Sequence, residues 1–192
     1  MDTPTELKIP TLVNRALNLA EQIEFTGECS HEVGRLLQVF VGHIQSGVVG
    51  ELCAGCGVGT SWIASALKPT TSFVTIEEDG SHAAAVKRLV EPYLNIRVIT
   101  GQWRTLLKEW KFSLLFASTY SERKSAQAYL LNALVPGGLI ILDGLPPRGK
   151  LSLGDSPTTA ELRDYWLNEP RVYSVEVQVS QRESVILATR RG

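Results

Sequence analysis

The stretch Val48-Val49-Gly50-Glu51-Leu52-Cys53-Ala54-Gly55-Cys56-Gly57-Val58-Gly59-Thr60-Ser61 joins an apolar run that ends in a carboxylate to a glycine-rich turn and then to a helix. Glycines allow a backbone to take positive φ angles and to approach a ligand closely. The helix that follows presents free N–H groups and the positive end of its dipole to the turn. The stretch therefore predicts a site for a nucleotide-like ligand.

A second carboxylate follows at the end of the next apolar run. This run is Ser72-Phe73-Val74-Thr75-Ile76-Glu77, so Glu77 stands 26 positions after Glu51 (77 minus 51). A carboxylate can accept hydrogen bonds from both hydroxyls of a ribose. Two acids at the ends of successive strands strengthen the prediction of a nucleoside site.

The glycine spacing argues against two common nucleotide sites. A dinucleotide fingerprint needs Gly-x-Gly-x-x-Gly, and counting from Gly55 or Gly57 puts Thr60 or Trp62 at the third glycine position. A phosphate-binding P-loop ends in Gly-Lys-Ser or Gly-Lys-Thr, whereas Gly59-Thr60-Ser61 has no lysine. We therefore expect neither NAD nor ATP.

Composition indicates one compact soluble domain: 192 residues, 44% of them hydrophobic, with a net charge of −1. No apolar run approaches the roughly 20 residues of a membrane span, and residues 1–6 do not resemble a signal peptide. Because there is no cluster of Lys or Arg, nucleic acid is not an expected partner. We expect a cytoplasmic protein with a small-molecule partner and no membrane attachment.

Three cysteines are too few for a secreted disulfide framework. Cys53 and Cys56 form a C-x-x-C motif. Such a motif can carry redox chemistry or form half of a zinc site, or its cysteines can simply be small residues that line a ligand loop. No second pair is present, and we favour the ligand loop.

Apolar runs alternate with amphipathic segments along the chain, which is the pattern of a parallel sheet covered by helices. The last two runs, separated by a few polar residues, predict an antiparallel hairpin. We expect a doubly wound α/β fold with a seven-stranded, mostly parallel sheet. After the first strand, which carries Glu51, the expected strands are 72–77, 96–100, 113–117, 139–143, 172–179 and 184–189. The expected helices are 60–67, 81–93, 102–110, 121–134 and 158–167, and a turn is expected at 136–138.

Two further helices, 11–24 and 31–44, are expected before this unit because apolar residues recur there at helical spacing. We expect residues 1–46 to cap the sheet or to form a dimer contact. Residues 47–192 are expected to form the ligand-binding domain, in a single globular unit with the first helices.

From Ser30 onward the chain resembles class I S-adenosylmethionine (SAM)-dependent methyltransferases, and more narrowly the catechol and caffeoyl-CoA O-methyltransferase family. The antiparallel hairpin at the end of the sheet is one point of resemblance, and Cys53 stands where that family usually has glycine. The segments that carry the resemblance are residues 30–37, the loop Glu51-Leu52-Cys53-Ala54-Gly55-Cys56-Gly57, and Thr75-Ile76-Glu77, Thr100-Gly101-Gln102-Trp103 and Leu134-Val135-Pro136-Gly137-Gly138-Leu139-Ile140.

The resemblance implies SAM as the cofactor and gives individual residues their roles. Glu51 would hold the methionine amino group, Glu77 would bind the ribose, and Gly57 and Gly59 would give the methionine part room. Gln102 and Trp103 would flank the adenine. The cofactor-binding residues expected in this way are Glu51, Cys53, Ala54, Gly55, Gly57, Gly59, Glu77, Glu78, Gln102, Trp103 and Ser118.

This chain departs most from the family's pattern at the positions of the family's metal site. An Asp after the fourth strand and an Asp-Asn pair after the fifth are usual, and this chain has Ser118, Asp143 and Gly144 at those positions. A hard divalent cation held by one carboxylate and one hydroxyl would bind poorly. We expect no metal ion, and expect Asp143 to face the methyl-transfer pocket instead.

The resemblance and the residues together predict a SAM-dependent, metal-independent methyltransferase for a small-molecule acceptor. The alternative is a SAM-binding protein that has lost catalysis and has a regulatory or structural role. Candidate catalytic bases near the carboxyl ends of the strands are Asp143, Tyr120 and Glu122. The resemblance favours a homodimer.

The loop after the fifth expected strand carries two cations, Arg148 and Lys150. They would either bind an anionic acceptor or serve only solubility.

Overall fold

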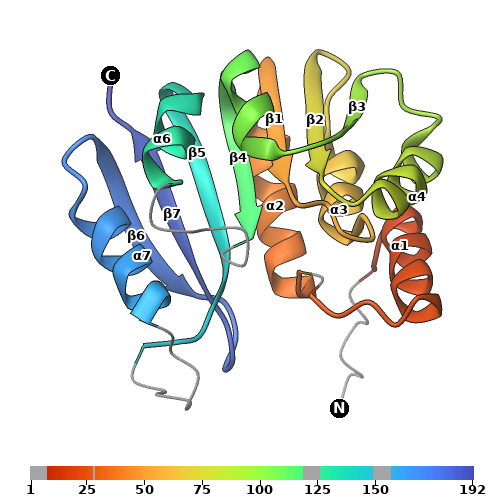
Figure 1. Cartoon of the computed structure of the whole chain (residues 1–192), viewed down its shortest axis with the longest axis horizontal. Coiled ribbons are helices and arrows are strands. Elements are labelled where there is room, and N and C mark those ends of the chain that lie inside the picture. Colours follow the sequence, from red (N-terminus) through yellow and green to blue (C-terminus); the bar gives the residue numbers. More distant parts are fainter. Residues whose placement is uncertain (1–7, 28, 119–125, 149–156) are drawn as a thin grey trace, which may run out of the picture.

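A single seven-stranded sheet forms the centre of the molecule, in the order β3-β2-β1-β4-β5-β7-β6 (Figure 1). The computed structural model describes residues 8–27, 29–118, 126–148 and 157–192. Strands β1 to β5 are parallel, and β7 is antiparallel to both of its neighbours, β5 and β6. The predicted fold is confirmed. The strands are β1 (Gly47–Leu52), β2 (Thr71–Glu77), β3 (Ile96–Thr100), β4 (Phe112–Ser118), β5 (Leu134–Leu145), β6 (Val172–Gln178) and β7 (Ser184–Arg190).

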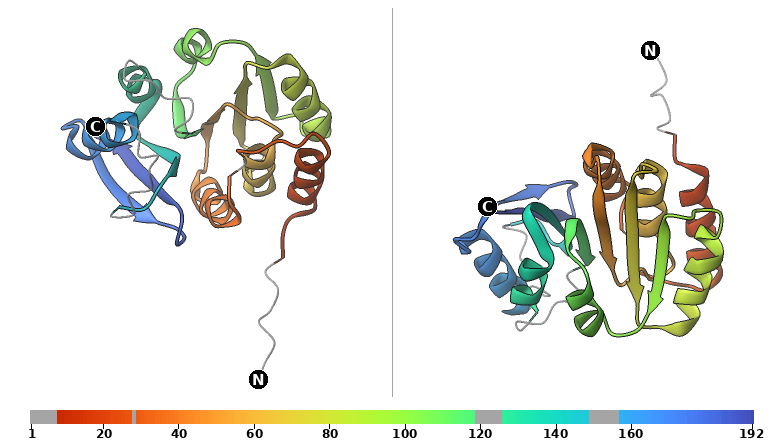
Figure 2. Two further views of the ribbon diagram at one scale, coloured as in Figure 1. Left: turned by 60° about the horizontal axis from the view of Figure 1, so that its bottom comes forward. Right: turned by 90° about the horizontal axis from the view of Figure 1, so that it is seen from above.

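Helices cover both faces of the sheet (Figure 2). One hydrophobic core joins the first three helices to one face, and a second core joins the later helices to the other. The first layer is α1 (Thr11–Gln22), α2 (His31–His43) and α3 (Val58–Ala66), with α4 (Gly80–Val90) at its margin, and the second is α5 (Trp103–Leu106), the short helix η1 (Leu107–Glu109), α6 (Gln127–Ala133) and α7 (Pro157–Asn168).

Strand β4 shows why these strands are continuous apolar runs. Leu114 and Phe116 belong to the core on one face, and Leu115 and Ala117 to the core on the other. Successive side chains of a strand point to opposite faces, so a strand with both faces covered must be apolar at every position.

The structure differs from expectation around β5. The turn expected at 136–138 lies inside β5, which already begins at Leu134. These residues form a bulge in the pairing of β4 with β5. Phe112 pairs with Leu134 and Leu114 pairs with Leu139, so five positions of β5 lie against two of β4. Gly137 in this bulge has a φ of 77°. The helix expected over 121–134 begins at Gln127 in the structure, and residues 119–125 lie outside its described part.

The carboxyl ends of the parallel strands share one edge of the sheet, and the connection from α1 to α2 runs along this edge (Figure 1). This edge is where ligands bind in open α/β sheets. Within the described ranges, no helix combines the length and apolarity needed to cross a membrane.

Candidate functional site

The glycine-rich loop after β1 is built on three left-handed residues. Cys53 has a φ of 60°, Gly55 of 52° and Gly57 of 83°, and α3 begins directly afterwards. A side chain in this conformation costs about 1 to 2 kcal/mol, which gives a physical reason for the glycine usual at the position of Cys53. The sequence had predicted this loop correctly, but not the left-handed conformation of Cys53.

Glu77 ties the loop to the end of β2. Its Oε2 accepts a hydrogen bond from the N–H of Gly55 at 2.7 Å, and its Oε1 accepts one from the N–H of Asp79 at 2.9 Å. The side chain is buried. Because each carboxylate oxygen has two lone pairs, both oxygens retain acceptor capacity.

Glu51 is buried at the end of β1, with 2% of its surface exposed. Its Oε2 accepts hydrogen bonds from the hydroxyls of Thr60 at 2.5 Å and Thr75 at 2.7 Å. Both hydroxyls bind the same oxygen, Oε2. Burial raises the pKa of the Glu51 carboxyl to about 7, although the two threonine hydroxyls oppose the shift. The site therefore holds a carboxyl that is easily neutralised by a proton or a cation.

Gly59 and Gly57 allow close packing within the protein. A Cβ on Gly59 would collide with Oε1 of Glu51 and lie 3.0 Å from the ring of Phe116, and a Cβ on Gly57 would lie 3.1 Å from both Val86 and Leu89. Where a Cβ would extend from either glycine, other side chains of this protein already fill the space, so no room for a ligand lies there.

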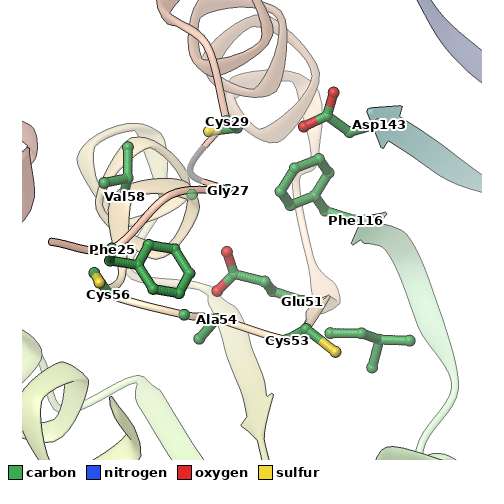
Figure 3. A pocket seen from close by; sticks show the side chains of 13 residues that line it. Phe25, Gly27, Cys29, Glu51, Cys53, Ala54, Cys56, Val58, Phe116 and Asp143 are labelled. Carbon is green, nitrogen blue, oxygen red and sulfur yellow. The ribbon is translucent and has the colours of Figure 1, made fainter. Parts of the chain in front are cut away.

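A small cavity of about 30 Å³ lies between the loop and the α1–α2 connection, with the Glu51 and Asp143 side chains extending toward it from different strands (Figure 3). Phe25 covers the loop: its ring is 2.6 Å from where a Cβ of Gly55 would be, and it packs edge-on against His82 with ring centres 5.3 Å apart. Because the sequence predicts a cofactor beside this loop, we call the cavity the cofactor pocket; its lining residues are Phe25, Gly27, Cys29, Glu51, Leu52, Cys53, Ala54, Gly55, Cys56, Val58, Gly59, Phe116 and Asp143.

Asp143, near the end of β5, belongs to a carboxyl pair. Its Oδ1 accepts the N–H of Gly144 at 2.6 Å, and the carboxyl of Glu183, which precedes β7, lies beside it. Burial, and then the Glu183 charge, raise the pKa of Asp143 to about 7. Ser30 donates its hydroxyl to Oε2 of Glu183 at 2.5 Å and also accepts the N–H of Val33, capping α2.

A larger hollow of about 420 Å³ adjoins the cofactor pocket, and Gly27 and Cys29 line both. We call it the outer hollow; its lining residues are Leu17, Thr26, Gly27, Cys29, Ser30, His31 and Glu183. The Asp143–Glu183 pair lies where the two spaces meet, because Asp143 lines the first and Glu183 the second.

Glu78, Gln102 and Trp103 do not line the cofactor pocket. Glu78 and Gln102 are exposed, and Trp103 is buried in the core beneath α5, with the Arg104 guanidinium 4.7 Å from the centre of its ring. Ser118 ends β4, opposite Asp143 in the register. The candidate bases Tyr120 and Glu122 lie outside the described residues.

Sequence reasoning missed the residues that the α1–α2 connection and the C-terminal hairpin bring to the site. Phe25 and Cys29 come from that connection, and Glu183 from the turn before β7. They are distant in sequence from the glycine loop and form no motif with it. The one local signal was the helix start Ser30-His31-Glu32, which fixes where the connection ends.

Neither a metal centre nor a free cationic loop is found where the structure describes the chain. No group of three or more His, Cys, Asp or Glu side chains in those ranges is arranged to hold a metal ion. Arg148 forms an ion pair with Glu176 at 2.7 Å, and Arg163 binds the same carboxylate at 3.0 Å. Lys150 lies outside the described residues. Arg148 is therefore engaged on the β6 side of the sheet.

The chain matches no protein-family model, and no curated protein sequence matches it. Solved structures do match it over nearly their whole length. A methyltransferase from Geobacter sulfurreducens superposes with a TM-score of 0.80 and 16% identity, covering 97% of this chain and 93% of that one. An O-methyltransferase from Bacillus cereus in complex with S-adenosylhomocysteine (SAH) gives 0.79 and 20%, covering 97% and 94%.

The O-methyltransferase TomG from Streptomyces achromogenes, in complex with SAM, gives a TM-score of 0.79 and 18% identity, covering 98% of this chain and 93% of that one. TM-scores of 0.79 to 0.80 over more than nine-tenths of each chain establish a shared fold. With its strand order 3-2-1-4-5-7-6 and its glycine loop between β1 and α3, this chain has the fold of the class I SAM-dependent methyltransferases.

Proposed function

We propose that this protein is a SAM-dependent methyltransferase that acts on a small-molecule acceptor without a metal ion. The observation that carries the proposal is the placement of two carboxylates around the glycine loop: Glu51 lines the cofactor pocket, and Glu77 holds the loop from the end of β2. The fold neighbours with bound SAM or SAH support the same cofactor.

The residues present fit this cofactor. Both threonine hydroxyls donate to Oε2 of Glu51, which leaves Oε1 as an acceptor for the methionine ammonium group. Glu77 retains lone pairs for the ribose hydroxyls. Because the cofactor pocket has room for about one water molecule, binding requires the segment that carries Phe25 to move away from Gly55.

SAM supplies an activated methyl group, so the protein has little bond chemistry to perform. Its own residues would align the acceptor, exclude water and take up a proton where the acceptor must lose one. Asp143 is placed for the last task, because its carboxyl lines the cofactor pocket and its pKa of about 7 lets it exchange a proton near neutral pH.

The test is calorimetric titration with SAM, SAH and NAD, each with and without Mg²⁺. We expect SAM and SAH to bind, NAD not to bind, and Mg²⁺ to have no effect. Glu77→Gln should weaken SAM binding at least about tenfold, because an amide cannot accept at both positions. Glu109→Gln, an exposed change of the same charge, is the matched control.

Absence of SAM and SAH binding would overturn the proposal and make the glycine loop a structural turn. Stabilisation of the protein by Mg²⁺ that is lost in Asp143→Ala would contradict metal independence.

A SAM-binding protein without catalysis is the second candidate. It is favoured by the replacement of two of the three usual metal ligands with Ser118 and Gly144. Tight binding of SAM together with no formation of SAH across a broad acceptor panel would support this candidate over the enzyme.

A further inference from the structure

The junction of the cofactor pocket and the outer hollow holds two carboxyl groups side by side. Asp143 faces the cofactor pocket with 5% of its surface exposed, and Glu183 faces the outer hollow. Asp143 lies on β5 and Glu183 directly precedes β7, in the antiparallel part of the sheet, where the register shifts between the pairs of Leu142 and Leu145. This irregularity sets Asp143 beside the residue that precedes β7.

A backbone N–H and a hydroxyl donate hydrogen bonds to this pair. The Gly144 N–H donates to Asp143 and the Ser30 hydroxyl to Glu183. Within residues 8–27, 29–118, 126–148 and 157–192, no Lys, Arg or His side chain forms an ion pair with either carboxyl. The other titratable side chains that line the two spaces are Cys29, Glu51, Cys53, Cys56 and His31.

Asp143 is buried and Glu183 is half-buried, so the two adjacent carboxylates repel each other, and a cation between them relieves this repulsion. Removing an isolated charge from water costs several kcal/mol. The protein elsewhere pairs such a group directly: Glu176, whose side chain is 8% exposed, binds two guanidinium groups. Among the described residues, the Asp143–Glu183 pair has no ion pair of the kind that Glu176 has.

We propose that the outer hollow is the acceptor site and that the acceptor is an amine whose ammonium group binds between Asp143 and Glu183. This inference rests on the proposed function, because it places the acceptor next to the cofactor pocket. The hollow has room for a small molecule, and Leu17 offers an apolar contact beside the polar groups of Ser30 and His31.

The carboxyl pair would also account for the proton that an amine must lose. The ammonium gives one proton to a carboxylate of the pair, and the nitrogen lone pair then forms a bond to the methyl carbon. The carbon–sulfur bond of the sulfonium breaks, and its electron pair stays on sulfur. The products are a methylated ammonium, SAH and a protonated carboxyl, which returns its proton to solvent.

The experiment compares benzylamine, benzyl alcohol and benzoate, which share one ring and differ in charge. Each is titrated into the ¹⁵N-labelled full chain saturated with SAH at pH 7.5, and amide shifts report both affinity and place. We expect benzylamine to bind at least about tenfold more tightly than benzyl alcohol, as for hydrogen bonds to charged groups, and to shift the amides of Ser30 and Glu183.

The informative variant is Glu183→Gln, which keeps an acceptor for Ser30 and removes the charge. We expect it to weaken benzylamine binding at least about tenfold and to leave SAH affinity within error. Glu109→Gln is the control of equal charge at an exposed site.

Equal affinity for the amine and the alcohol, tighter binding of benzoate, or amide shifts away from the outer hollow would each overturn the inference. So would a Glu183→Gln variant that binds benzylamine as the wild type does. Failure of the chain to bind SAH is a separate result, because it refutes the proposed function before any acceptor is added.

Discussion

Replacing Glu51 by Gln removes a buried charge without removing the hydrogen bonds that its Oε2 accepts from Thr60 and Thr75. Burial raises the pKa of Glu51 from 4.5 to about 7. The folded state therefore binds the proton more tightly than the unfolded state. The stability that this carboxyl contributes is present below pH 4.5 and is lost as the pH rises through 7.

The magnitude follows from these two pKa values. A shift from 4.5 to about 7 corresponds to about 3 kcal/mol of stability lost once the pH exceeds both values. Between pH 5 and pH 8 the wild type should lose about 2.5 kcal/mol through this group alone. Glu51→Gln does not titrate and should escape this loss.

The assay is urea unfolding of wild type and Glu51→Gln at pH 5, 6, 7 and 8. We expect the variant's advantage in free energy of unfolding to grow with pH by about 2.5 kcal/mol over this range. The Asp143 contribution, present in both proteins, cancels in the difference. A difference that does not change with pH would refute the argument from burial, and Glu109→Gln, whose side chain is exposed, should show none.

Substitutions at three further positions test the packing around the site, each by urea unfolding. Gly34→Ala should destabilise the protein by about 2 kcal/mol, because its Cβ would collide with the ring of Trp62; normal stability would show that α2 and α3 are further apart than described. Cys53→Gly should stabilise the protein by about 0.5 to 1 kcal/mol, since it removes the strain of a left-handed side chain but adds the entropy cost of glycine. Cys53→Val should destabilise it, and a valine variant more stable than the glycine variant would contradict the positive φ of Cys53. Ser30→Ala should destabilise the protein by about 1 kcal/mol through loss of the α2 cap. Ser30→Thr should retain most of the stability of the wild type, because its hydroxyl can still cap the helix. Equal losses of stability in both variants would mean that the hydroxyl does not act as the cap.

Local patterns were sufficient to predict the elements and their order. The apolar runs of β1, β2 and β4 are continuous because helices cover both faces, and that requirement is visible in the sequence itself. Pro136-Gly137-Gly138 was expected as a turn, but long-range pairing with β4 keeps it within a strand as a bulge. Strand pairing decided this case, because it supplies backbone hydrogen bonds that no local signal encodes.

The candidate site divides in the same way. Glu51, Gly55 and Glu77 were predicted from spacing, since strand ends and glycine turns are local features. Trp103 was expected beside an adenine, yet it is buried in the core beneath α5, because an aromatic residue after a turn has the same local signature in both roles.

The sequence by itself determined the alternating fold and the glycine loop with its two carboxylates, because both depend on residues close together in the chain. Only the tertiary structure placed Phe25 over that loop and Glu183 beside Asp143. Residue 183 follows residue 143 by 40 positions, with α7 and β6 between them, and their contact arises when β7 inserts antiparallel between β5 and β6. Such a contact depends on the path of the chain through the sheet, which no sequence spacing specifies.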